Sequence, residues 1–148
     1  MLSARFCLTS SWLVLCCAVS AAANDLSTVE STTADAELHP VEVKIIDQTN
    51  ALRKRHGLAR LTISINLVRS ARQHTSWMCR NQSLVHTSRQ VGENIATGQQ
   101  TAAEALRDWM NSPGHRANIL NPRYTQIGVA AYRIGQDGAI YWCQQFLY

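Results

Sequence analysis

The segment Trp109–Val129, WMNSPGHRANILNPRYTQIGV, marks the point at which the chain changes from helices to strands. Serine is a favoured helix cap and proline is well tolerated at the first helical position, so Ser112 and Pro113 predict a short helical turn that carries His115. A second segment, His86–Ala96 (HTSRQVGENIA), also sets an imidazole and a carboxylate beside turn-forming residues. Such segments lie at the surface of a folded domain, where binding sites are built.

Helical patterns precede strand patterns along the rest of the chain. The predicted helices span residues 41–55, 66–79 and 101–111, and the predicted strands span residues 127–134 and 139–146, with a third strand at either 61–65 or 92–95. Asn66 is a suitable N-cap for the second helix, and Thr101 with Glu104 has the spacing of a capping box for the third. Helices followed by strands favour an α+β layered domain over a doubly wound parallel sheet.

The first 23 residues have the features of an export signal. Arg5 lies near the start, an apolar stretch follows it, and small residues at 21–23 suit a cleavage site. The stretch is shorter than the roughly 20 apolar residues that a membrane span needs, so the mature chain is expected to be secreted and to lack a transmembrane segment. A retained N-terminal anchor is the main alternative, and lipid attachment at a cysteine of the stretch is a weaker one.

Residues 24–40, rich in serine, threonine and acidic side chains, are predicted to be a disordered linker, and residues 41–148 a single domain. Removal of the signal leaves two cysteines, Cys79 and Cys143. An even pair in an oxidising compartment predicts a disulfide, with two buried free thiols as the alternative.

The domain is basic and the linker acidic. Residues 41–148 hold 13 lysines and arginines against 6 acidic residues, a net charge of +7. Such a domain is attracted to anionic cell-wall polymers, phospholipid headgroups or nucleic acid. The only dense run, residues 53–56, lies near a predicted helix C-terminus and is interpreted mainly as solvated surface charge. Nucleic acid is a poor candidate, since basic and aromatic residues are not interleaved.

Three side chains are candidates for a shared site: His86, Glu93 and His115. Two imidazoles and a carboxylate suit zinc or another divalent ion, or acid–base chemistry around a bound water. The alternative is that His86 is a solvent-facing loop residue and His115 a hydrogen-bonding group at a helix terminus. His74 lies on an apolar helical stripe and is interpreted as a core histidine, and Trp77 is likewise assigned to the core.

Five motifs together resemble a known superfamily. The chain resembles the cysteine-rich secretory proteins, antigen five and pathogenesis-related proteins (the CAP superfamily), and most of all its bacterial SCP-like domains. The motifs are HT at 86–87, GENIA at 92–96, WMNSPGHRANIL at 109–120, YTQIGV at 124–129 and YWCQQF at 141–146. The resemblance implies a three-layer α-β-α sandwich with a small central antiparallel sheet.

The resemblance also implies a cleft with two histidines and two acidic residues, which in several members holds zinc. His86 and Glu93 match the first two of these positions. Ser112 stands where eukaryotic relatives carry glutamate, and Arg123 where they carry histidine, so His115 is the candidate replacement imidazole. The remaining candidates for ligand contact are Asn94, Arg116 and Tyr124. A guanidinium cannot ligate a metal, so zinc or another divalent cation is expected to bind only weakly at His86 and His115.

Two functions follow as expectations. The first is a secreted binding or interaction module whose cleft and basic surface engage a cell-envelope lipid, a polysaccharide or a partner protein. The second is a divalent-metal-dependent hydrolase, such as a peptidase, in which Glu93 activates a water held by His86 and His115. The first is favoured because one carboxylate cannot serve both as a zinc ligand and as the base.

Overall fold

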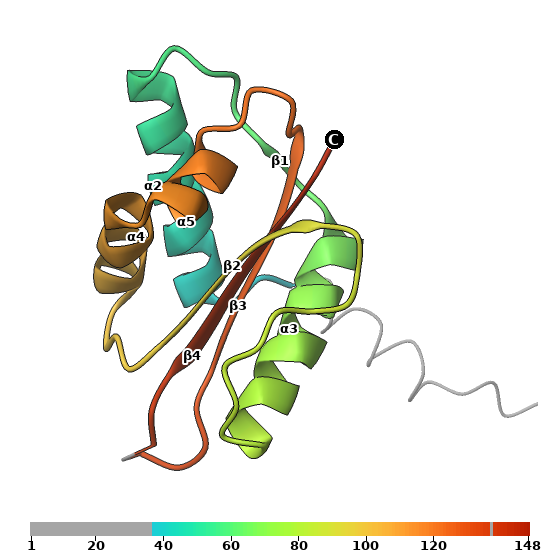
Figure 1. Cartoon of the computed structure of the whole chain (residues 1–148), viewed down its shortest axis with the longest axis vertical. Helices are drawn as coiled ribbons and strands as arrows, with labels where there is room; N and C mark the ends of the chain where they lie inside the picture. Colours follow the sequence, from blue (N-terminus) through green and yellow to red (C-terminus); the bar gives the residue numbers. More distant parts are fainter. Residues whose placement is uncertain (1–36, 137) are drawn as a thin grey trace, which may run out of the picture.

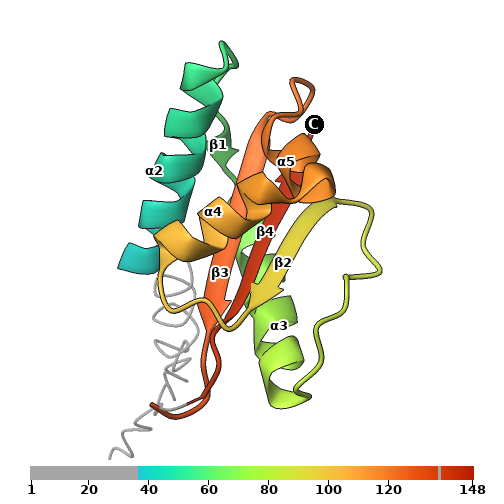
Figure 2. The same cartoon turned by 60° about the vertical axis from the view of Figure 1, so that its left-hand side comes forward.

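The computed structural model describes residues 37–136 and 138–148, and the predicted export signal and most of the predicted linker lie outside them. The described chain forms a four-stranded sheet between helical layers (Figures 1 and 2). Its elements are α2 (Pro40–Arg55), β1 (Thr62–Ile63), α3 (Ile65–Arg80), β2 (Gly92–Thr97), α4 (Ala102–Asn111), α5 (Pro113–Ile119), β3 (Gln126–Tyr132) and β4 (Tyr141–Leu147). The predicted α+β sandwich is confirmed.

The strands lie in the order β1-β3-β4-β2. β3 and β4 form the predicted antiparallel hairpin, and β2 pairs antiparallel with the other side of β4. Both candidate positions for a third strand are therefore strands. The expectation of an antiparallel sheet is wrong at β1, which runs parallel to β3 with Thr62 beside Gln126. A parallel pair needs a long crossover, and the chain from α3 through α5 supplies it.

Alternate residues of the sheet face two separate apolar layers. Trp142 packs with α2 and α4 on one side, whereas its neighbour Cys143 packs with Ala71 and Met78 of α3 on the other. Figure 2 shows α3 alone on one face of the sheet, with α2, α4 and α5 on the opposite face. The period of two along β4 thus builds both cores.

Helix starts agree with the sequence to within one or two residues. Thr101 caps α4 as predicted, because its side chain accepts the backbone N–H of Glu104. α2 begins at Pro40, where His39 donates its backbone N–H to the Glu42 carboxylate. The cap of α3 is Ser64 and not Asn66, which lies inside the helix. Within residues 37–136 and 138–148, no helix is both long and apolar enough to cross a membrane.

Two predictions about side chains in the α3 layer are wrong. Cys79 and Cys143 are free and buried, so no disulfide joins them. The Cys143 thiol instead lies 3.6 Å from the Glu93 carboxylate. Trp77 is 48% exposed, because it stands on the outward face of α3, away from the stripe that carries Met78.

Arg53 is fully buried, although it belongs to the run interpreted as surface charge. Its guanidinium donates to four backbone carbonyls, those of Ala59 (2.9 Å), Ile119 (2.9 Å), Asn121 (2.9 Å) and Tyr124 (3.3 Å). These bonds join the end of α2 to the end of α5 and to the approach to β3. Arg53 therefore holds α5, and with it His115, against the rest of the domain.

We expect Arg53→Lys to lower the free energy of unfolding by about 3 kcal/mol, because an ammonium group cannot reach four carbonyls and leaves buried acceptors unpaired. Urea unfolding followed by circular dichroism measures the change. Arg55→Lys, at an exposed position of the same helix, is the matched control and should stay within about 0.5 kcal/mol of the parent. A loss below about 1 kcal/mol for Arg53→Lys would contradict this account.

Candidate functional site

The candidate site lies at the start of β2, where neighbouring residues face opposite layers. Glu93 pairs with Gln145 of β4, and Asn94 pairs with Gln144. Because side chains alternate along a strand, Glu93 faces the α3 layer and Asn94 faces α5. The beginning of β2 therefore reaches both sides of the sheet.

The Glu93 carboxylate is surrounded by donors. Its Oε1 accepts the backbone N–H of Thr87 and the Nδ1–H of His86, each at 2.9 Å. Its Oε2 accepts the Gln145 amide at 3.0 Å and lies 3.6 Å from the Cys143 thiol. The side chain is only 4% exposed. Both oxygens are thus fully engaged by the protein.

These donors keep Glu93 ionised. Burial alone would raise its pKa, but hydrogen bonds from Gln145, Thr87 and His86, together with the nearby charge of His74, bring the pKa below its ordinary value of 4.5. A carboxyl group whose pKa is lowered by folding stabilises the fold above its ordinary pKa, and this contribution is lost as the pH falls through the lowered value. At neutral pH, Glu93 is a fixed negative charge.

Glu93 in turn fixes the tautomer of His86. An ionised carboxylate only accepts hydrogen bonds, so Nδ1 of His86 must carry the proton. In the neutral ring, Nε2 is then the acceptor. The side chain of His86 is 61% exposed, unlike that of Glu93. The protein thus presents an oriented imidazole to solvent, backed by a buried carboxylate.

His115 lies in the first turn of α5, where its carbonyl accepts the Asn94 amide at 3.1 Å. Burial lowers the pKa of His115, and the charge of His86 lowers it further. The structure therefore brings His86 and Glu93 into direct contact, and it links His115 to β2 through Asn94, the residue that follows Glu93.

A second hydrogen-bond network lies on the α5 side of β2. Asn94 donates to the Gln144 side chain at 3.1 Å and accepts from Asn118 at 2.9 Å. Asn118 also donates to the Glu93 carbonyl at 3.1 Å, and Gln144 donates to Thr49 of α2 at 2.8 Å. Asn94 therefore orients the backbone of β2 and α5, and is itself fully buried.

Several residues of the site were not predicted. Gln144, Gln145, Asn118, Cys143 and His74 all contact Glu93 or Asn94. The pair of glutamines is the signal that sequence reasoning had available, because two amides in succession are unusual in a strand that is otherwise apolar. His74 fits its core interpretation in part: its Nε2 lies 2.9 Å from the Val85 carbonyl, but also 3.7 Å from the Glu93 carboxylate.

The other predicted contact residues are spread around the site. Ser112 is the residue before α5 and is half-buried, but its side chain makes no capping hydrogen bond; Arg116 is exposed on α5. Tyr124 is buried against β2, where a Cβ placed on Gly92 would collide with its hydroxyl. Arg123 lies over the ring of Tyr148, with its Cζ 5.3 Å from the ring centroid. The guanidinium of Arg123 therefore pairs with the Tyr148 ring.

The residues present offer little to a metal ion. Within residues 37–136 and 138–148, no three histidine, cysteine, aspartate or glutamate side chains are grouped to hold one. Nε2 of His86 and the ring of His115 are the available donors, because both oxygens of Glu93 are engaged. Weak binding of a divalent cation at His86 and His115 therefore stays a prediction.

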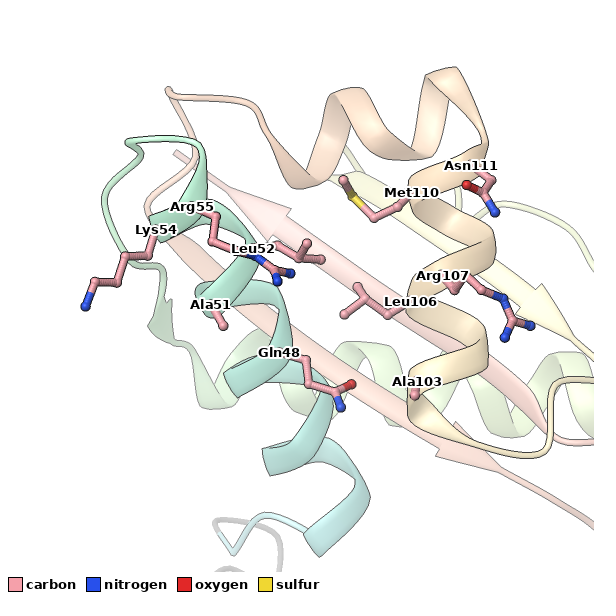
Figure 3. A pocket seen from close by; sticks show the side chains of 10 residues that line it. All are labelled: Gln48, Ala51, Leu52, Lys54, Arg55, Ala103, Leu106, Arg107, Met110 and Asn111. Atoms are coloured by element: carbon pink, nitrogen blue, oxygen red, sulfur yellow. The ribbon is translucent and has the colours of Figure 1, made fainter.

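A cavity of about 500 Å³ lies elsewhere, between α2 and α4. Figure 3 shows its apolar side chains between the two helices and its charged side chains around them. It is lined by Gln48, Ala51, Leu52, Lys54, Arg55, Ala103, Leu106, Arg107, Met110 and Asn111. Arg55 is the cation turned toward the apolar side chains, and an apolar floor beside one cation suits a ligand that is apolar along its length and anionic at one end.

Comparison with known proteins gives consistent matches. The profile of the Cysteine-rich secretory protein family matches residues 46–146. YkwD of Bacillus subtilis (strain 168) is 37% identical in an alignment that covers 79% of this chain and 51% of YkwD, so the chain spans about half the length of that curated relative.

Two solved structures share the fold. An extracellular protein of Bacillus anthracis that contains an SCP domain has a TM-score of 0.64 and 29% identity, over 75% of this chain and 44% of that one. An outer surface protein of Borrelia burgdorferi also has a TM-score of 0.64, with 19% identity, over 78% of this chain and 93% of that one. The predicted three-layer SCP-type architecture is confirmed by both.

The influence of the His86 charge on the pKa of His115 can be tested by NMR titration. We expect His115 to titrate below its ordinary pKa of 6.5, and the pKa to rise part of the way back in His86→Asn, because one of its two causes is removed while burial remains. His56→Asn, exposed at the end of α2, is the control and should leave the His115 titration unchanged. An identical His115 titration in the parent and in His86→Asn would show that the two rings do not share a site.

Proposed function

This chain belongs to the cysteine-rich secretory protein family, and we propose that it acts outside the cytoplasm as a binding module whose ligand meets the exposed edge of His86. Its solved relatives include an extracellular protein and an outer surface protein. Export of the chain through residues 1–23 is part of this proposal. The ligand is a molecule of the cell envelope or its surroundings.

The saturation of the Glu93 carboxylate carries the proposal. A general base needs a lone pair free to take a proton from water, and a metal ligand needs one free to bind the ion. Each Glu93 oxygen already accepts from a protein donor at 2.9–3.0 Å, and the side chain is buried. Glu93 is therefore a positioning residue that holds His86 in one tautomer and one orientation.

An oriented, half-exposed imidazole is well suited to recognition. Nε2 of neutral His86 accepts a hydrogen bond from a hydroxyl or amide group of a ligand, and His115 adds a second ring whose neutral form is favoured by burial. His115 belongs to α5, whose backbone Asn94 binds, and the ring of His86 is held by its bond to Glu93. Such preorganisation lowers the entropic cost of binding.

The second candidate function is a hydrolase that depends on a divalent metal. Glu93 as its base would first have to give up two or more hydrogen bonds, each of which also offsets the burial of its charge. His86 is better placed for proton transfer, because its Nε2 faces solvent while Nδ1 is held. The hydrolase therefore needs a conformational change that the binding module does not.

We expect zinc to bind with a dissociation constant of roughly 0.1 mM or weaker, because only two protein ligands are available. The shifts of the imidazole resonances during a zinc titration measure this affinity. His86→Asn and His115→Asn should each abolish the binding, whereas His56→Asn should not. Tight binding that survives loss of both rings, or turnover of a generic peptide library that Glu93→Gln abolishes while the fold persists, would contradict the proposal.

The cavity between α2 and α4 favours a lipid as one partner of the module. Its floor is formed by apolar side chains such as Leu52, Leu106 and Met110, which gain from contact with an acyl chain. Arg55 reaches toward the space between the two helices beside Leu52 and suits a carboxylate or phosphate, whereas Lys54 and Arg107 point away from it (Figure 3). We infer that a single-chain anionic lipid fits this cavity.

Dodecanoate, kept below its micellar concentration, should bind the protein more tightly than the dodecyltrimethylammonium cation does, because the border of the cavity is positive. Ala103→Phe fills the cavity and should weaken dodecanoate at least about tenfold in isothermal titration calorimetry. Ala117→Phe, exposed on α5, is the matched control. Equal affinity for the two amphiphiles, or no effect of Ala103→Phe, would contradict lipid binding in this cavity.

A further inference from the structure

The outer side of α3 carries a groove that is separate from the sites described above. One pocket of about 310 Å³ is lined by Gln73, Trp77, Arg80 and Asn81. A second, of about 330 Å³, shares Gln73 and Arg80 and extends to Tyr132 at the end of β3. Figure 1 shows the end of α3 beside the end of the β3–β4 hairpin. We call these five residues the α3 groove.

Each end of the α3 groove presents an aromatic ring. Trp77 is 48% exposed and Tyr132 is 41% exposed. The ring of His74 stacks on Trp77, with centroids 6.3 Å apart and planes at 4°. His74 is itself held by the Val85 carbonyl at 2.9 Å. The indole therefore lies parallel to a neighbouring ring that is itself held in place.

Polar groups lie between the two rings. Asn81 donates to the Trp77 carbonyl at 2.8 Å, which leaves its amide oxygen as an acceptor. Arg80 is held by the Ser76 hydroxyl at 3.2 Å and keeps further N–H donors. Within the part of the chain that the structure describes, neither the Gln73 amide nor the Trp77 indole N–H has a hydrogen-bond partner. Donors and acceptors are thus available along the groove.

This arrangement matches the chemistry of a sugar chain. A hexose has an apolar C–H face that packs on an aromatic ring and a border of hydroxyl groups that need donors and acceptors. Two rings in one groove suit a ligand with repeating units. An acyl chain fits less well, because it would remove water from Gln73 and Arg80 without replacing their hydrogen bonds.

The charge of the groove selects among sugars. Arg80 is a permanent cation, and residues 41–148 carry a net charge of +7. We propose that the α3 groove binds an acidic polysaccharide, with one sugar ring stacked on Trp77 and a carboxylate of the chain paired with Arg80. The proposal is independent of the role of His86, since neither His86 nor Glu93 lines the groove.

The test uses the full chain and four probes: tetragalacturonate, which carries a carboxylate on every ring, chitotetraose, which is neutral, phosphatidylglycerol vesicles, and a polyglutamate peptide with the same charge as tetragalacturonate. Isothermal titration calorimetry measures each affinity, and the indole N–H resonance of Trp77 in the parent reports where tetragalacturonate binds. Tetragalacturonate should shift it and bind most tightly. Trp77→Ala should weaken that binding at least about tenfold, and Tyr132→Ala should weaken it less. Arg80→Gln should weaken tetragalacturonate about tenfold and leave chitotetraose within about twofold.

Tyr148→Ala is the matched control, because Tyr148 is 62% exposed and lies at the far end of β4 from the hairpin. It should leave tetragalacturonate binding unchanged. Since His74 also lies 3.7 Å from Glu93, the His115 titration is repeated in Trp77→Ala to verify that the Glu93 network is intact. The proposal is overturned if 10 mM tetragalacturonate causes no shift or if Trp77→Ala leaves its affinity unchanged. It is also overturned if the protein prefers the vesicles or a polyglutamate peptide of equal charge.

Discussion

A buried carboxylate stays ionised only where donors replace the water it has lost, and this constraint governs the whole site around Glu93. The groups that stabilise its charge come from separate parts of the chain: the loop before β2, strand β4 and helix α3. None of them can move without weakening the support of that charge. The position of His86 therefore follows from the need of the buried Glu93 carboxylate for hydrogen-bond donors. The orientation of the solvent-facing imidazole is thus determined by a group in the interior of the protein.

The start of β2 also couples the two layers of the sandwich. Glu93 engages the α3 side while the next residue, Asn94, engages α5 and, through Gln144, α2. Arg53 completes the frame by joining the end of α2 to the end of α5 through four carbonyls. A displacement of α5 would thus move His115 and break the hydrogen bond from Asn118 to the Glu93 carbonyl. The site is rigid because hydrogen bonds join its residues to the sheet and to both helical layers.

Sequence patterns predicted the local structure well, but they predicted the positions and partners of buried polar side chains less well. The Thr101 cap and the terminal hairpin were predictable because both depend on neighbouring residues, although the Glu104 carboxylate accepts the N–H of Gln100 and so does not complete the capping box. Arg53 was misassigned within a charged run, although it falls on the stripe that also carries Ile46 and Asn50 at helical spacing. His86 and Glu93 were found by motif, but the role of Gln145 as a donor depends on strand register, which a sequence without the fold does not provide.

The two unbonded cysteines have a consequence for how readily the domain reacts with oxidants. Burial, the charge of Glu93 and its hydrogen bond raise the pKa of Cys143 well above the ordinary value, so the thiolate that reacts with oxidants is scarce. Cys79 is shielded in the same layer. Both thiols therefore lie in the interior of the described fold, where an oxidant in solution meets neither of them directly.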